Sequence, residues 1–283
     1  MTTTSDQPSG PGAPQPATTL ERPSSTDPIF NEIGTIVRFI GTTFKELPKA
    51  LRYPDEVLRQ AARLILGSAL VVWTLLVVDG VLVGQIGHYL LQQIGAQSYV
   101  GLFAAAGTLK GSAPIFFGFI VAAKIGCGFA AELGAMRINE EIDALEVMGI
   151  SSQSYLVGTR VLAYIVVAPA LWLIGIGMCF YANYLTNVPI LGSVSSGGYF
   201  SVFWAFTTPT DFALLALLWS MIPTVLVIII GCYYGMTASG GPAGVGENTA
   251  ISMAVNVSLI TILGAGIMFQ AFYGTGVVVP IAN

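Results

Sequence analysis

The residues that could do chemistry are concentrated in one short stretch of an apolar chain. Residues 130–150 read AAELGAMRINEEIDALEVMGI, and six charged side chains fall within them: Glu132, Arg137, Glu140, Glu141, Asp143 and Glu146. Only six other charged residues follow Arg63 in the whole remaining chain. Carboxylates at this density can steer the docking of a basic partner or simply face water. The stretch is therefore a candidate docking surface.

No other combination of side chains predicts an enzyme. The chain has one histidine, His88, and its three cysteines (Cys127, Cys179 and Cys232) lie in separate apolar runs with neither zinc nor disulfide-framework spacing. No Ser-His or Cys-His arrangement is visible. The nucleotide-binding motif GxxxxGK[ST] is missing, and the glycine-rich GGPAGVGEN at 240–248 lacks its lysine. We expect a tight turn there, and no catalytic residue, metal or cofactor on this chain.

Composition places the chain in a membrane. It is 54% hydrophobic and 9% charged, whereas soluble domains carry about 25% charged residues. The net charge of −4 and the lack of a basic stripe argue against nucleic acid as a partner.

The first residues differ from the rest. Residues 1–28 are rich in Pro, Ser, Thr and Gly and lack the features of a signal peptide, which predicts a disordered cytoplasmic tail. Residues 29–53 have apolar side chains at helical spacing with charges between them, which favours an amphipathic helix in the membrane interface. A soluble amphipathic helix packed on a partner is the alternative. We expect Pro48 to kink or divide it.

Five apolar segments are long enough to span a bilayer, which needs about 20 residues. They cover about 64–90, 99–131, 155–185, 212–236 and 250–272. The second could be broken at Pro114 and the glycines near it. The predicted fold is an all-α polytopic membrane protein, with a permease domain over 29–283 and five transmembrane helices after the interfacial helix.

Lysine and arginine predict the orientation. Arg52, Arg59 and Arg63 precede the first span, Arg137 and Arg160 flank the turn after the second, and the loop at 186–211 has neither residue type. The positive-inside rule then makes the N-terminus cytoplasmic and the C-terminus external. His88 and the aromatic run YFSVFWAF at 199–206 are expected at the outer interface.

The charged stretch itself predicts a short amphipathic helix over 138–149. Ile138, Ile142 and Leu145 line one side, and Glu140 and Asp143 lie opposite. The acids face water or a partner; an ordinary solvated loop helix is the alternative.

Two charges fall deep within predicted spans. Asp79 and Lys110 lie at similar depths at about 1.5 Å per residue, and intramembrane ionisable residues usually pair inside the bundle. We predict an Asp79–Lys110 pair, with a role near the lipid path or misplaced spans as alternatives. Lys124 lies nearer the cytoplasmic end and can snorkel.

AELGAMRINEEIDALEVMGI resembles the signature of the MlaE/YrbE permeases, the membrane subunits of ABC transporters that move lipids with MCE proteins. The resemblance runs from about Ile29 to the C-terminus, includes GGPAGVGEN, and is greatest to actinobacterial YrbE proteins of the second type in each Mce operon. It implies an inner (plasma) membrane permease that couples a partner ATPase to lipid passage. The residues implied in that coupling are Glu132, Gly134, Met136, Arg137, Glu140, Glu141, Asp143, Ala144, Leu145 and Met148.

Within this resemblance, Glu132, Gly134 and Met136 form the turn before the coupling helix, while Ile142 and Leu145 anchor in a groove of the ATPase. The implied partners are an ATPase dimer that binds ATP and Mg²⁺, a second, non-identical permease, MCE proteins outside and a lipid such as a fatty acid or sterol. The resemblance favours import of this lipid over export. The competing functions are a channel or secondary transporter of small hydrophobic solutes and an intramembrane enzyme.

Overall fold

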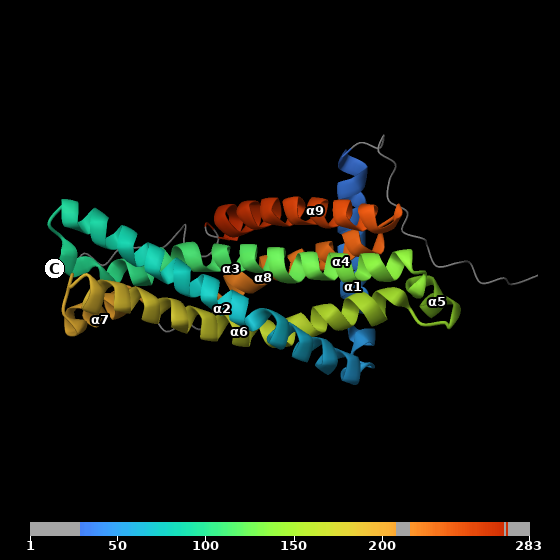
Figure 1. Ribbon diagram of the computed structural model, residues 1–283, viewed down its shortest axis with the longest axis horizontal. Coiled ribbons are helices and arrows are strands. Elements are labelled where there is room, and N and C mark those ends of the chain that lie inside the picture. The colour runs from blue at the N-terminus through green and yellow to red at the C-terminus, as the bar shows by residue number, and fades with distance from the viewer. Residues whose placement is uncertain (1–28, 208–215, 269, 271–283) are drawn as a thin grey trace, which may run out of the picture.

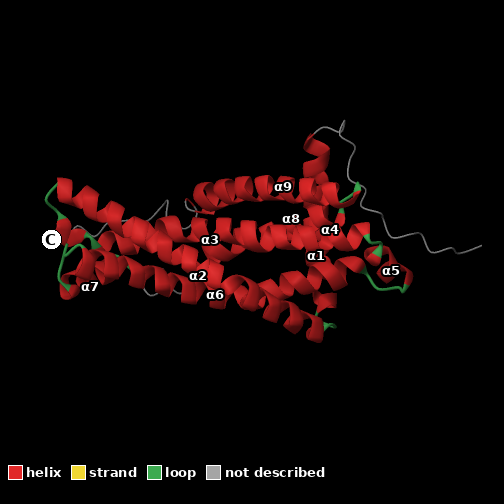
Figure 2. Ribbon diagram, viewed as in Figure 1, coloured by secondary structure: helices red, strands yellow, loops and turns green. Residues whose placement is uncertain are grey.

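The computed structural model describes residues 29–207, 216–268 and 270, and every regular element among them is a helix (Figure 2). The predicted tail at 1–28, the first residues of the fourth predicted span and the last residues of the fifth lie outside this part. Long helices lie side by side, and α1 (Ile29–Ala50) crosses them near one end (Figure 1).

Five helical segments are long and apolar enough to cross a membrane in the described part of the chain, which confirms the predicted all-α polytopic fold. The first is α2 (Pro54–Gln93), the fourth α8 (Ala216–Met236). The second joins η2 (Phe103–Ser112), α3 (Ala113–Val121), η3 (Ala122–Gly126) and α4 (Cys127–Ile138). The third joins η4 (Gln153–Gly158), α6 (Thr159–Leu185) and η5 (Thr186–Ile190). The fifth joins α9 (Gly241–Leu259) and η7 (Ile260–Met268).

The remaining elements are short. They are η1 (Gln97–Tyr99), α5 (Glu141–Val147) and α7 (Ser196–Ala205). The residues Gly240 and Gly241 both have positive φ and make the turn into α9. GGPAGVGEN is therefore mostly the first turns of a helix, and the predicted turn is confined to its start.

Neither proline interrupts the helical chain. Helix α1 is not divided at Pro48 and ends two residues later at Ala50; the predicted kink there stays a prediction. Pro114 stands at the start of α3, directly after the π-helical η2. The wider π-helical turns already shift the backbone hydrogen bonds, so the missing proline N–H is tolerated within one spanning segment.

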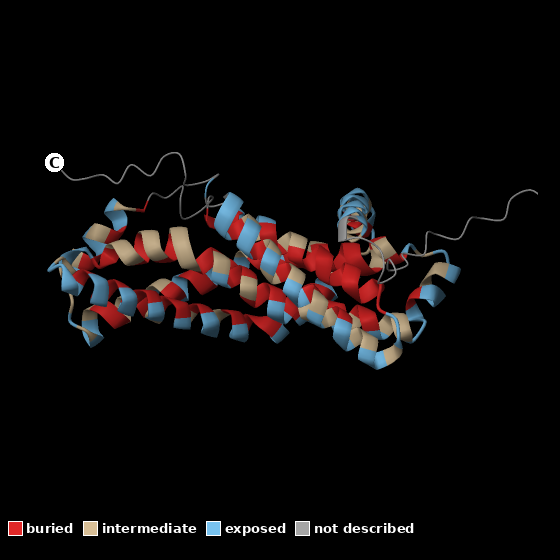
Figure 3. Cartoon of the chain, turned by 90° about the horizontal axis from the view of Figure 1, so that it is seen from above, coloured by how far each residue is buried: buried red, intermediate tan, exposed pale blue. Residues whose placement is uncertain are grey.

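The core forms where helices approach backbone to backbone. Helix α2 packs along α6, and a Cβ on Gly80 would overlap the backbone carbonyl of Cys179. Helix α8 also lies close to the second span, with Gly231 against Gly126 and Gly235 against Ala130. Buried residues fill the middle of the bundle (Figure 3), as expected when small residues let apolar helices pack closely.

Several outward faces are apolar and exposed. Leu66 of α2 is 87% exposed, and only 22% of the most apolar window of the fifth segment is buried. These faces are suited to contact with lipid hydrocarbon or with an apolar surface of another protein. Neither environment offers hydrogen-bond partners, and the apolar side chains require none.

The end of the bundle away from α5 is closed by polar contacts. His88 Nδ1 lies 2.6 Å from Ser193 Oγ, and the Tyr199 hydroxyl donates to Asn183 Oδ1 at 2.8 Å. Burial raises the pKa of the Tyr199 phenol, so it stays protonated and able to donate. The predicted aromatic segment forms α7, in which Tyr199 and Phe203 are buried and Trp204 is exposed.

Gly80→Ala should destabilise the protein, because a methyl group would push α2 away from the Cys179 carbonyl of α6. Overpacking of this kind costs about 1–3 kcal/mol. Gly177→Ala is the matched control, since a Cβ there would meet no heavy atom within 4 Å. Thermal unfolding in detergent should show a lower midpoint for Gly80→Ala alone. Equal midpoints for the two variants would contradict the close α2–α6 packing.

Candidate functional site

The charged stretch forms a corner at one end of the bundle. Helix α4 runs to Ile138, Asn139 and Glu140 turn the chain, and α5 begins at Glu141 (Figure 1). Glu140 has φ of 59°, the one positive value at a non-glycine residue in the described chain, and Gly149 with φ of 77° follows α5. The predicted single helix over 138–149 is therefore too long, because left-handed residues bound α5 on both sides.

The apolar residues at α5 face both the bundle and the solvent. Ile142 is 2% exposed and joins the core, and Leu145 is half-buried against it. Val147 and Met148 are 89% and 66% exposed. The expectation that Ile142 anchors in a partner groove is wrong, because its side chain is used to hold α5 on the bundle. The exposed apolar side chains at this tip are those of Val147 and Met148.

The acidic residues also divide into two groups. One group is exposed, with no side-chain hydrogen bond to another described residue: Glu140 and Glu141, next to the exposed Ala144. The other group is bonded within the chain. The guanidinium of Arg137 donates to the carboxylate of the exposed Asp143, and Ser152 Oγ donates to Glu146 Oε1 at 2.6 Å. These two bonds fasten α5 to the chain before and after it. Glu140 and Glu141 are thus the acids of the tip that remain available for docking.

The segment after α5 reaches the crossing helix α1. Gln153 Nε2 donates to Thr42 Oγ1 at 2.8 Å and to Thr43 Oγ1 at 3.2 Å. Ser152, the partner of Glu146, directly precedes it. A set of polar contacts therefore runs from α5 through Ser152 and Gln153 to α1.

Glu132, Gly134 and Met136 do not form a turn; all three lie within α4. Glu132 Oε1 accepts from Arg160 Nη2 at 3.0 Å and lies 3.7 Å from Arg63 Nη1. A Cβ on Gly134 would lie 2.8 Å from Val245, so this glycine admits the start of α9. Met136 is half-buried against the core. Their shared role in the structure is to join helices below the tip.

Arg160 is the centre of these contacts. Its side chain is 3% exposed, its Nη1 donates to the Leu156 carbonyl at 2.9 Å, and its guanidinium carbon lies 5.6 Å from the Phe129 ring centroid. Burying a guanidinium is costly unless it is paired. Glu132 therefore links α4 to α6 and, through Arg63, to α2.

The intramembrane carboxylate lies between three segments. Asp79 is buried in α2, and its Oδ2 accepts from Ser112 Oγ at 2.9 Å, with Cys179 Sγ at 3.8 Å. Ser112 ends η2, the same π-helix that carries Lys110. The Asp79–Lys110 pair stays a prediction.

Sequence reasoning missed Arg160, Gln153 and Val147. Val147 could have been found from the helical register, because it lies one turn after Asp143 on the exposed side. Arg160 had a signal in being a lone charge at the start of a span. Gln153 had none, since its partners precede it by about a hundred residues along the chain.

Comparison with known proteins then decides the family. The model of the family described as permease MlaE matches residues 57–272, most of the chain. The chain belongs to the MlaE permease family. The match includes all five spanning segments apart from the first residues of α2, and it includes the α4–α5 corner.

Relatives of this MlaE-family chain carry consistent names. A probable ABC transporter permease protein of Synechocystis is 30% identical over 185 residues, 64% of this chain and 68% of the relative. One from Rickettsia bellii is 29% identical over 181 residues, 64% and 69% of the two chains. The chloroplast protein trigalactosyldiacylglycerol 1 of Arabidopsis thaliana is 29% identical over 188 residues, 65% of this chain and 51% of that protein.

Glu132→Gln should lower stability clearly, because it leaves the buried Arg160 guanidinium without a counter-charge. Charged hydrogen bonds contribute about 1.5–3 kcal/mol. Arg63→Gln is the control, since the Arg63 side chain is 59% exposed and exposed pairs contribute about 0–1 kcal/mol. Thermal unfolding should rank Glu132→Gln well below Arg63→Gln, and the reverse ranking would remove Arg160 from the centre of the cluster.

Proposed function

We propose that this protein is the membrane permease subunit of an ATP-driven lipid transporter of the ABC class. The observation that carries the proposal is the tip of α5. It combines the exposed carboxylates of Glu140 and Glu141 with the exposed apolar side chains of Val147 and Met148. An apolar anchor with charges around it suits docking on another protein, because the apolar contact gives affinity and the charges give orientation.

The docking partner in this proposal is an ATPase chain that binds ATP and Mg²⁺. Family membership and the names of the relatives support it. The proposed ATPase pushes on α5, and the bonds of Asp143, Glu146 and Gln153 pass the movement to α4, α6 and α1. The permease contributes no catalytic group to hydrolysis.

Lipid is the proposed cargo. The Arabidopsis relative is named for a galactolipid, and this chain exposes apolar faces on α2 and on its fifth segment. Acyl chains need such surfaces, because covering polar walls would remove their bound water and leave their polar groups without hydrogen bonds. Fatty acids and sterols both fit this chemistry, and the actinobacterial YrbE resemblance favours import.

The proposed assembly follows the same resemblance. A second, non-identical YrbE-like permease covers part of the exposed apolar surface, MCE proteins bind at the end formed by α7, and two ATPases bind at the α5 end. The protein lies in the inner (plasma) membrane with the N-terminus in the cytoplasm and the C-terminus outside, as the positions of Arg52, Arg59 and Arg63 suggest.

Purification of the tagged protein from its native membrane with gentle detergent tests the assembly. Mass spectrometry should identify an ATPase, a second permease and MCE proteins in constant ratio. A chain that purifies alone or only with itself would favour the channel or secondary-transporter alternative.

Charge reversal at the tip should release the ATPase. Glu140→Lys with Glu141→Lys leaves the internal Arg137–Asp143 and Ser152–Glu146 bonds in place, so the membrane part should stay folded. We expect at least a tenfold loss of co-purified ATPase, because repulsion at a docking surface costs several kcal/mol. Val147→Ser with Met148→Ser tests the apolar contact separately.

Glu247→Lys is the control, because it makes one of the same Glu-to-Lys charge reversals at an exposed residue of α9. Its ATPase yield should equal that of the unchanged protein. If both tip variants retain full ATPase, α5 is not the docking helix.

The Asp79–Lys110 pair is tested by exchange. Asp79→Lys and Lys110→Asp should each reduce the yield of folded protein, because each places like charges in the membrane interior. Combining them should restore much of the yield if the two side chains pair. Failure of the exchange to rescue either single variant would contradict the pair.

A further inference from the structure

One cleft in the described part of the chain lies apart from the docking tip. It opens between α2 and the η3–α4 part of the second span and has a volume of about 210 Å³, several times the ~30 Å³ share of one water molecule. Arg63 and Lys124 contribute cations from its two sides, and Glu132 closes one end.

The charge balance of the cleft favours an anion. The Glu132 carboxylate is already shared between Arg160 at 3.0 Å and Arg63 at 3.7 Å. Lys124 is exposed, and no ion pair found between described residues includes it. Arg63 and Lys124 are thus two cations in the lining of the cleft, and its one carboxylate is already shared with Arg160 outside it. A second anion between Arg63 and Lys124 would be attracted by both.

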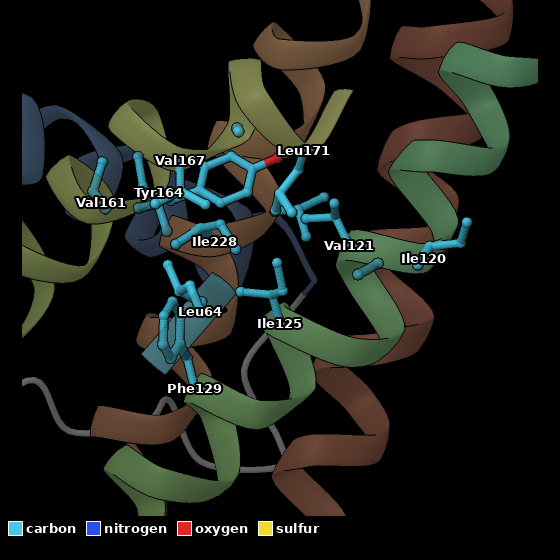
Figure 4. Packing of buried hydrophobic residues seen from close by; sticks show 14 of the residues in the cluster. Leu64, Ile120, Val121, Ile125, Phe129, Val161, Tyr164, Val167, Leu171 and Ile228 are labelled. Carbon is cyan, nitrogen blue, oxygen red and sulfur yellow. The ribbon is translucent and has the colours of Figure 1, made fainter. Parts of the chain in front are cut away.

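The floor of the cleft is apolar. Leu64, Ile125 and Phe129 lie together there, as Figure 4 shows, and all three are buried. Beyond the cleft, Val71, Leu75 and Val78 continue the same side of α2 at helical spacing and are exposed. A cationic recess thus leads into an apolar strip, which matches a molecule with one anionic head and a hydrocarbon chain.

Two glycines leave the cleft open. A Cβ on Gly67 or Gly128 would meet no heavy atom within 4 Å, so helix packing does not require a glycine at either position. Glycine within a helix costs about 1 kcal/mol relative to alanine. Both residues line the cleft, and the space they leave is the part of it that a head group would fill.

The cleft also lies at a suitable level. Phe39 of α1 packs on Tyr233 of α8 with ring centroids 5.4 Å apart, and Gly235 of α8 packs on Ala130 of α4. The amphipathic α1 therefore crosses the bundle at the level of the α4 residues that bound the cleft (Figure 1). Amphipathic helices of this type lie where head groups meet hydrocarbon.

From these observations we infer that the cleft binds the phosphate head group of an anionic phospholipid, with an acyl chain along Val71, Leu75 and Val78. Arg63 and Lys124 hold the phosphate, and Gln60 and Ser68 line the same recess and can add hydrogen bonds. The site requires only that the chain is embedded in a membrane, and so it does not depend on the ATPase docking proposed above.

Native mass spectrometry of the detergent-purified protein tests this site, with phosphatidylglycerol as the anionic probe and phosphatidylcholine as the zwitterionic one. The unchanged protein should retain phosphatidylglycerol more strongly. Lys124→Gln should weaken its retention about tenfold, the effect expected when one charged hydrogen bond is lost. Gly128→Leu should abolish it by filling the recess while every charge remains.

Arg59→Gln and Gly177→Leu are the matched controls. Arg59 is an exposed cation one turn before Arg63 that does not line the cleft, and Gly177 faces open space on α6. Both should bind phosphatidylglycerol like the unchanged protein. Equal retention by all five forms, or no preference for the anionic lipid, would overturn the proposal.

Inorganic phosphate separates a lipid head group from a free anion. It should displace phosphatidylglycerol only at concentrations far above that of the lipid, because it cannot use the apolar strip. Displacement at equal concentration would identify a site for a soluble anion and overturn the lipid assignment. Loss of ATPase binding in the tip variants with unchanged lipid retention would separate this site from the docking function.

Discussion

The structure depends on one constraint: inside hydrocarbon, each polar group must find its partner within the protein. For the backbone this leaves only helices in a chain without a closed barrel, which is what the spanning segments are. For side chains it means that a buried charge persists only where a counter-charge or hydrogen-bond donor meets it. Arg160 with Glu132, and Asp79 with Ser112, are the two places in the described bundle where this is most evident.

This constraint explains why the fold was largely predictable and the site only partly so. Hydropathy alone determines which segments span, because each needs enough consecutive apolar residues, and Asp79 or Lys124 interrupts such a run without ending it. The ends of helices were less predictable. The break at Glu140 depends on a left-handed backbone that glutamate rarely adopts. Helix α4 continues past the predicted end of its span to Ile138, since hydropathy marks where apolar residues stop and not where the helix ends.

The docking helix shows the same division between local and distant information. Its acidic residues are close together in the sequence, so the helix could be recognised from the sequence alone. Which side of α5 faces the bundle depends on where α4 ends. If α5 began one residue earlier or later, all its side chains would turn by about 100° relative to the bundle. Ile142 then enters the core and Val147 the surface. The pattern identified the helix and its outward acids, whereas only the packing showed that Ile142 is used inside the bundle.

Glu132 connects the cleft on α2 with the buried charge on α6. It was expected at a docking turn, yet it lies between the buried Arg160, which holds α6, and Arg63, which lines the cleft on α2. An anion in the cleft would draw Arg63 away from Glu132, because the 3.7 Å separation is the weaker of the two contacts. The carboxylate would then rest on Arg160 alone, and α2 would be held to α4 through the bound head group. Occupancy of the cleft would thus change the strength of the contact between α2 and α4, the helix that leads directly into α5.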